Sequence, residues 1–180
     1  ILHDQAGKVA GVIAEDIETN KKYQMKAKSV VNATGVFVDD IIQMDKPSDH
    51  RLVKPSQGVH LVFDKSFLNS DYALMIPSTS DGRVLFAVPW HNKVVVGTTD
   101  IVREKAELEP IPLEEEIDFI MKTAGLYMTR KPERKDILSI FAGQRPLAAP
   151  RKEGKSTKEI SRSHKIIVSD NNLITITGGK

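Results

Sequence analysis

Residues 83–97 read RVLFAVPWHNKVVVG, and this stretch decides the predicted fold. Two apolar runs, Arg83–Pro89 and Lys93–Gly97, flank the dipeptide His91-Asn92, which is placed to form the turn between them. Strands that follow one another this closely pair antiparallel, because a parallel pair needs a long crossover connection. The sequence therefore predicts a β-hairpin at this point of the chain.

The predicted hairpin extends outward into a larger antiparallel meander. Ser56–Asp64 and Tyr72–Ile76 are short apolar runs before the hairpin, and Asp136–Ala142 is a further strand after it. Asp81-Gly82 is a strong signal for a hairpin turn ahead of residue 83. The close spacing of these runs favours an antiparallel sheet.

One amphipathic helix is predicted between the strands. Pro112 suits the first helical turn, and the acidic run 114–116 complements the positive end of the helix. Gly125 is a suitable stop after the last turn. The apolar residues of the helix fall on one stripe and are Leu113, Ile117, Ile120, Met121 and Ala124. The predicted class is therefore α+β, an antiparallel sheet with a helix packed on it.

Shorter elements are predicted toward both ends of the chain. They are a hairpin of 8–18 and 23–28, a strand over 27–33 that Thr34-Gly35 ends, a helical segment over 36–44, and a hairpin of 165–168 and 173–177. The last hairpin is turned by the polar residues 170–172, which favour a tight turn.

The composition is that of a globular chain, with 40% hydrophobic and 28% charged residues among 180. Cysteine is absent, which excludes a disulfide framework and a thiolate metal site. No apolar run is long enough to predict a transmembrane helix. The net charge is only +2, although residues 151–165 hold six basic and two acidic side chains. This segment predicts a solvated loop, because a nucleic-acid patch would need aromatic residues nearby.

Two segments of the first half carry residues that are suited to chemistry. The predicted strand that ends in Ala33-Thr34-Gly35 lets either a cofactor or a neighbouring helix approach its backbone. His60 lies on the strand face opposite Val59, and its ordinary pKa of ~6.5 suits proton transfer where it lines a pocket. A structural or merely exposed histidine is the alternative.

Two segments of the second half also carry residues that could take part in binding or catalysis. Arg145 precedes Pro146, which favours an extended backbone, and its planar guanidinium matches a phosphate or a carboxylate. A surface salt bridge is the alternative for this arginine. The end Gly178-Gly179-Lys180 frees backbone amides for a ligand and adds a positive charge, or simply forms a strand-ending turn.

Several signatures of known sites are missing from the sequence. No G-x-G-x-x-G dinucleotide fingerprint and no G-x-S-x-G nucleophile elbow are present. The five histidines show no H-E-x-x-H spacing, so no metal site is predicted.

Six segments follow one another in a familiar order. They read VVNATGVFVDDI, PSQGVHLVF, RVLFAVPWHNKVVVGTTD, ILSIFAGQRPL, ISRSH and ITITGGK. The series resembles the FAD-dependent glycerol-3-phosphate dehydrogenases, flavin enzymes that pass electrons to quinone or, in the oxidase branch, to oxygen. The resemblance runs from about residue 8 to residue 180 and is most specific in VPWHNKVVVGTTD, AGQRPL and GGK.

The resemblance implies a role for each matching residue. His60 corresponds to a histidine near the flavin and the substrate hydroxyl, and Lys180 to a lysine against the flavin and substrate. We therefore expect His60 to accept the hydroxyl proton and Lys180 to stabilise negative charge. Arg145 and Arg162 correspond to the arginines that bind the phosphate of glycerol 3-phosphate. The small residues that line the flavin correspond to Ala33, Thr34, Gly35, Gly143, Gly178 and Gly179. The sequence departs from the family pattern at Gln57, Ala142 and Ser163, where lysine, serine and an acid are usual.

The resemblance also implies a domain organisation. Residues 1–46 are expected to be part of an FAD domain, 47–140 a substrate-binding cap, and 141–180 a return toward the FAD domain. The chain opens at Ile1 and closes just after two glycines, so we expect a piece of a longer enzyme. The piece alone is expected neither to hold FAD nor to be active.

The expected partners belong to the longer enzyme. They are glycerol 3-phosphate and a quinone or other electron acceptor, in the cytoplasm or at the periphery of the inner face of its membrane; nucleic acid is not among them. Two other functions stay open. One is the cap of a related amino-acid oxidase, and the other is a non-catalytic module that binds anions through its basic loop.

Overall fold

The computed structural model describes residues 1–48, 50–77, 79, 82–148 and 163–178. The chain divides into two compact units. The first unit comprises Ile1–Pro55, Glu104–Ala106 and Arg145–Lys180, and the second comprises Ser56–Arg103 and Glu107–Gln144. Residues 151–162 of the predicted basic loop lie outside the described residues, whereas His164 and Lys165 at its end belong to a strand and not to a loop.

The first unit begins with a three-stranded sheet in the order β1-β2-β3. Its strands are β1 (Leu2–His3), β2 (Val9–Asp16) and β3 (Lys21–Lys26). β2 and β3 pair antiparallel around a turn in which Asn20 has a φ of 55°. This confirms the predicted hairpin. Strand β1 was not predicted, because two residues are too few to show a periodic pattern.

A second sheet of the first unit has the order β11-β12-β4. It contains β11 (His164–Val168), β12 (Leu173–Gly178) and β4 (Val30–Asn32). β11 and β12 form the predicted antiparallel hairpin. β12 also pairs in parallel with β4, which the sequence did not indicate. The carboxyl ends of β4 and β12 therefore lie at the same edge of this sheet.

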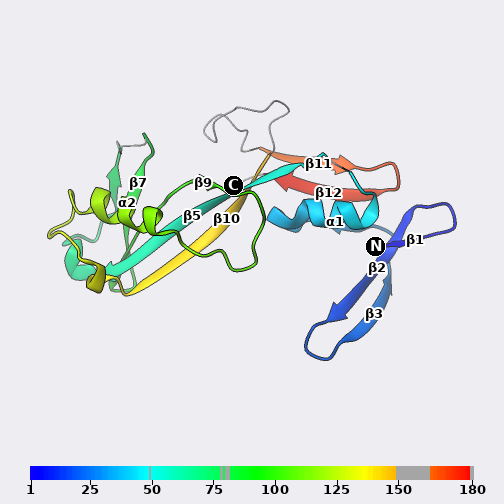
Figure 1. The fold of residues 1–180 in the computed structure, drawn as a ribbon, viewed down its shortest axis with the longest axis horizontal. Coiled ribbons are helices and arrows are strands. Elements are labelled where there is room, and N and C mark those ends of the chain that lie inside the picture. The colour runs from blue at the N-terminus through cyan, green and yellow to red at the C-terminus, as the bar shows by residue number, and fades with distance from the viewer. Residues whose placement is uncertain (49, 78, 80–81, 149–162, 179–180) are drawn as a thin grey trace. The chain divides into compact units, whose positions relative to one another are not determined.

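The helix of the first unit begins later than predicted. After β4 the chain makes a 3₁₀ turn, η1 (Gly35–Phe37), and only then the helix α1 (Val38–Asp45). α1 contacts β12 and lies along this sheet in Figure 1. The backbone of Phe37, with a φ of −97° and a ψ of 10°, lies outside the α-helical region, so the α-helix begins only at the next residue.

The second unit is built on a sheet with the order β10-β5-β8-β7-β6, and β9 pairs with β5. Its elements are β5 (Val53–Asp64), η2 (Lys65–Phe67), β6 (Leu74–Ile76), β7 (Leu85–Trp90), β8 (Lys93–Gly97), β9 (Ile101–Val102), α2 (Glu114–Ala124), η3 (Arg134–Asp136) and β10 (Ser139–Ala148). The division between units falls within β5 and within β10, so each of these strands has residues in both. The α+β class is confirmed.

The hairpin of β7 and β8 matches its prediction closely. Trp90 pairs with Lys93, and the two residues between them, His91 and Asn92, have φ values of 43° and 60°. Positive φ at both central positions is the geometry that fits the right-handed twist of two antiparallel strands. The turn therefore fixes which residues of β7 and β8 face each other.

The main hydrophobic core lies between one face of this sheet and α2. α2 contacts β7 and β8, and its stripe of Ile117, Ile120 and Ala124 is buried, as predicted. The sheet contributes fully buried residues at Val59, Leu61, Phe63, Leu85, Ala87, Val94 and Val96. No helix in the described ranges is long and apolar enough to cross a membrane.

Truncation of the core is the direct test of this packing. Leu61→Ala is expected to lower the free energy of unfolding by about 2–5 kcal/mol, because it leaves a cavity at a fully buried position. Leu108→Ala is the matched control, since Leu108 is 87% exposed, and its expected effect is within about 0.5 kcal/mol. Equal denaturation midpoints for the two variants in urea would contradict the assigned core.

Candidate functional site

His60 lies in a slot on the sheet face that α2 does not cover. Along β5, Val59 and Leu61 are fully buried in the core, whereas His60 between them is only partly buried. Its imidazole stacks on the ring of Phe141 from β10, with ring centroids 5.0 Å apart and an interplanar angle of 11°. On the other side, β8 places Gly97 directly opposite His60.

Gly97 is the residue that makes room for the imidazole. A Cβ atom at this position would lie 2.2 Å from Cδ2 of His60, much closer than van der Waals contact allows. The space for the ring therefore comes from a residue of the neighbouring strand. Phe141 and Gly97 together define the plane of the ring, and neither could be identified before the strand order was known.

Gln57, three residues before His60, points toward α2. Its side-chain nitrogen donates to Oε2 of Glu116 at 2.7 Å and to the carbonyl oxygen of Ile111 at 2.9 Å. Gln57 is fully buried, and its own Oε1 atom has no hydrogen-bond partner among the described residues. The side chain of Gln57 therefore joins β5 to the start of α2.

A second candidate site lies in the first unit, at the carboxyl edge of β4 and β12. Ala33 and Thr34 follow β4 directly, Gly35 opens η1, and Gly178 ends β12. The parallel pairing of the two strands brings these four predicted residues to one edge. In open α/β sheets, ligands bind at such carboxyl edges.

Asn32 holds the turn that follows β4. It is 2% exposed, donates from Nδ2 to the carbonyl oxygen of Val38 at 2.9 Å, and accepts from the hydroxyl of Thr34 at 2.8 Å. Nothing lies within 4 Å of the place where a Cβ of Gly35 would stand. Side-chain hydrogen bonds thus hold the turn, and the space beside the backbone of Gly35 is empty. Such space allows a cofactor to approach the backbone closely.

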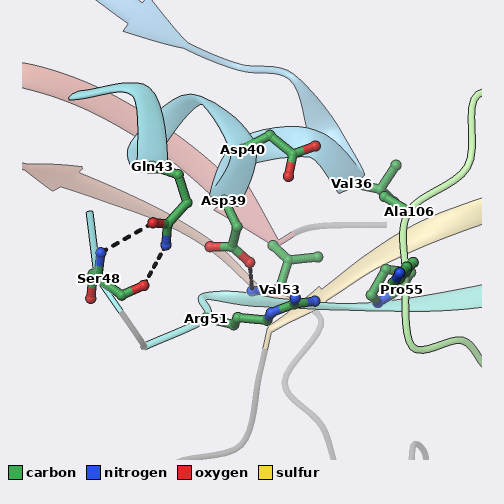
Figure 2. Close-up of a pocket in the computed structure, with 10 residues that line it drawn as sticks. Val36, Asp39, Asp40, Gln43, Ser48, Arg51, Val53, Pro55 and Ala106 are labelled. Carbon is green, nitrogen blue, oxygen red and sulfur yellow. Dashed lines mark hydrogen bonds between the residues drawn. The ribbon is translucent and has the colours of Figure 1, made fainter. Parts of the chain in front are cut away.

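A hollow of about 570 Å³ opens beside α1 in the first unit (Figure 2). The carboxylate of Asp39 accepts from the backbone N–H groups of Leu52 and Val53 at 2.9 and 3.1 Å. The side chain of Gln43 bonds to the backbone of Ser48. These polar groups hold the segment that leads into β5. Among the described residues, no cluster of three or more His, Asp or Glu side chains could hold a metal ion.

The other predicted residues are placed as follows. Arg145 is a partly buried residue of β10 that belongs to the first unit. Gly143 lies in the same strand within the second unit, with nothing within 4 Å of a Cβ built on it. Arg162, Gly179 and Lys180 lie outside the described residues.

Clear pKa shifts are found on several solvent-accessible side chains that lie outside the two candidate sites. The pKa of Asp64 is lowered, mainly because the backbone N–H of Ser66 donates to its carboxylate. The pKa of Asp71 is lowered by a hydrogen bond and by the charge of Lys65. Both shifts are local surface effects.

The family model described as FAD dependent oxidoreductase (DAO) matches residues 1–179. The chain therefore belongs to the family of FAD-dependent oxidoreductases. An open carboxyl edge on one sheet and a separate antiparallel sheet that carries a histidine agree with this class.

Within the family, the chain is similar to the mitochondrial glycerol-3-phosphate dehydrogenase of Saccharomyces cerevisiae. The two are 40% identical over 206 residues, which cover 97% of this chain and 32% of the yeast protein. The crystal structure of the glycerol-3-phosphate dehydrogenase from Bacillus halodurans complexed with FAD superimposes with a TM-score of 0.83 at 38% identity. The superposition includes 99% of this chain and 34% of the Bacillus halodurans chain. The chain thus spans about a third of the length of these two relatives.

A glycine oxidase from Bacillus cereus shares the fold, with a TM-score of 0.57 over 98% of this chain. The identity in that comparison is 16%, so the likeness extends to the fold alone.

The slot around His60 predicts a difference between two glycine substitutions. Gly97→Ala is expected to displace the imidazole and to cost about 1–3 kcal/mol of stability through overpacking. Gly143→Ala, whose new methyl group would meet open space, is the matched control and should leave stability unchanged within about 0.5 kcal/mol. NMR of the His60 ring protons would detect the displacement, and unaltered shifts in Gly97→Ala would contradict the slot.

The turn after β4 makes a second prediction. Asn32→Ala is expected to destabilise the first unit by about 1–3 kcal/mol, because it removes the buried hydrogen bonds that Asn32 makes with the carbonyl of Val38 and the hydroxyl of Thr34. Asn69→Ala is the control, since Asn69 is exposed. Hydrogen exchange of the amides in β4 and β12 would measure the effect. Equal protection in the two variants would show that Asn32 does not hold this turn.

Proposed function

We propose that this chain is the central, substrate-binding part of an FAD-dependent enzyme that oxidises glycerol 3-phosphate to dihydroxyacetone phosphate. The observation that carries the proposal is an identity of 38–40% to glycerol-3-phosphate dehydrogenases over nearly the whole chain. Oxidation at carbon 2 removes a hydride from carbon and a proton from the hydroxyl group. The residues of this chain have to bind the phosphate, hold the cofactor and take that proton.

The edge formed by Ala33, Thr34, Gly35 and Gly178 is the proposed contact for FAD. Gly35 has open space where a side chain would stand, and Gly178 has a φ of 71° that only glycine adopts readily. Backbone N–H groups at this edge can donate to polar atoms of the cofactor. When bound, FAD supplies the acceptor for the hydride. Gly143 and Gly179 complete the proposed set of small residues.

His60 is the proposed proton acceptor. Its imidazole is partly exposed, stacked on Phe141 and held beside Gly97, so its plane is defined before substrate arrives. A general base must reach the proton in a fixed direction, and preorganisation of this kind lowers the entropy lost on the way to the transition state. Neutral imidazole takes the hydroxyl proton while the hydride leaves carbon 2.

Arg145 is the proposed ligand of the substrate phosphate, with Arg162 as its partner and Lys180 as the stabiliser of negative charge. A guanidinium binds two phosphate oxygens at once, which fixes orientation as well as charge. The neighbouring Gln144 supports the region, because its side-chain oxygen accepts from the backbone N–H of Glu107 at 2.9 Å.

The domain roles follow the same proposal. Residues 1–46 and 141–180 would serve the FAD domain, and residues 47–140 the cap that binds substrate. The electron acceptor is proposed to be a quinone or another acceptor, with the enzyme in the cytoplasm or on the periphery of its membrane. Release of the complete protein from membranes by a carbonate wash would test the peripheral attachment.

The identity to the dehydrogenases favours glycerol 3-phosphate over an amino acid as substrate, since the glycine oxidase shares only 16% of its residues with this chain. Membership of an oxidoreductase family likewise favours a flavoenzyme over a non-catalytic anion-binding module. A substrate panel on the complete, FAD-loaded protein separates these functions. Reduction of the flavin by glycine rather than by glycerol 3-phosphate would overturn the proposal.

Arg145→Lys tests the phosphate assignment in the complete enzyme. We expect KM for glycerol 3-phosphate to rise about ten- to a hundredfold, because a charged hydrogen bond contributes about 1.5–3 kcal/mol and lysine cannot make the bidentate contact. Arg134→Lys is the matched control, since Arg134 makes exposed ion pairs with Glu114 and Asp118. An unchanged KM in Arg145→Lys would refute the assignment.

A further inference from the structure

β5 changes its partner just before His60. It pairs with β9 at Ser56 and Gln57 and with β8 from His60 onward, so Gly58 and Val59 lie between the two ladders. A buried backbone N–H at such a break needs another acceptor. The N–H of Val59 donates to the side-chain hydroxyl of Thr99 at 2.9 Å. The residue next to His60 is therefore held by a side chain of the segment that follows β8.

The Thr99 hydroxyl is fixed in its turn by a buried carboxylate. It donates to Oε1 of Glu116 at 2.6 Å, while Oε2 accepts from Gln57 at 2.7 Å and from the backbone N–H of Leu113 at 3.0 Å. Glu116 is 1% exposed, although the sequence pattern indicated an acid that merely complements the helix end. Burial of a carboxylate is energetically unfavourable unless hydrogen-bond donors satisfy its oxygens, and here three donors do so.

Thr99 is connected to both strands that border the imidazole, by a hydrogen bond to β5 and by its place in the chain just after β8. Val59 immediately precedes His60 on β5, and Thr99 comes two residues after Gly97, the residue that borders the ring from β8. A shift of Thr99 would therefore move β5 and β8 against each other at the point where the ring is held.

We propose that Glu116 and Thr99 are positioning residues for His60. Glu116 orients the Thr99 hydroxyl, Thr99 ties Val59 to the end of β8, and the imidazole keeps the direction in which it takes the substrate proton. This inference rests on the proposed function in so far as His60 is the proton acceptor.

Glu116 also has a structural role in α2, which the test has to separate from the positioning of His60. Glu116 also caps α2 through Leu113, and glutamine can replace glutamate in such a cap. Glu116→Gln retains one carbonyl oxygen for Leu113 and Gln57, but its amide nitrogen cannot accept from Thr99. Thr99→Val removes the hydroxyl at nearly constant shape, and Thr99→Ser restores it.

The test uses the complete FAD-loaded enzyme, with rates normalised to bound flavin. Thr99→Val and Glu116→Gln are expected to lower kcat for glycerol 3-phosphate about ten- to a hundredfold, as a misplaced catalytic group does. KM should stay within about twofold, because the phosphate ligand is untouched. Thr99→Ser should recover most of the rate. A second readout is the NMR signal of the His60 ring, which should shift in Thr99→Val and return in Thr99→Ser.

Two controls separate positioning from stability and from exposed charge. Ile120→Ala truncates a fully buried residue of α2 outside the network, and should keep kcat per bound flavin despite a lower melting temperature. Glu115→Gln neutralises the exposed acid next to Glu116 and should change neither parameter.

The failures are also distinguishable. If His60→Gln abolishes turnover while Thr99→Val and Glu116→Gln keep both kcat and the ring signal, the positioning role is wrong and the proposed function stands. If the unaltered enzyme does not oxidise glycerol 3-phosphate at all, the proposed function and the inference that rests on it both fall.

Discussion

The alternation of side chains along β5 is the constraint on which the second unit depends. Val59, Leu61 and Phe63 must face α2 to build the core, and the period of two then leaves His60 on the opposite face. A slip of one residue in pairing would bury the histidine and expose the core residues. The register of β5 therefore determines both the packing that stabilises the unit and the face on which His60 lies.

The parts of the fold that depend on neighbouring residues could be predicted from the sequence. The His91-Asn92 turn and the acidic first turn of α2 follow from local backbone preferences and charge, and both were confirmed. Pro112, which was predicted in the first helical turn, instead lies one residue before the N-cap Leu113. The parallel pairing of β4 with β12 could not be predicted, because it joins segments from opposite ends of the chain. The helix expected from Val36 begins at Val38, because the backbone of Phe37 lies outside the α-helical region.

The same distinction holds for the candidate sites. His60 could be assigned to the correct face from periodicity alone, and Ala33, Thr34 and Gly35 to a strand end. Phe141 and Gly97 could not be recognised as neighbours of the imidazole, because strand order decides that contact. Glu116 carries no signal in the sequence that separates it from Glu114 and Glu115, although burial makes its role entirely different.

The parallel pairing of β4 with β12 also imposes an order on assembly during synthesis. The second unit consists of chain that is nearly continuous in sequence, so its sheet can form while later residues are still being added. The edge beyond Asn32 has no such freedom, since its partner strand starts at Leu173 and closing so long a loop is slow. Any ligand held at that edge must wait until the ribosome has delivered both strands.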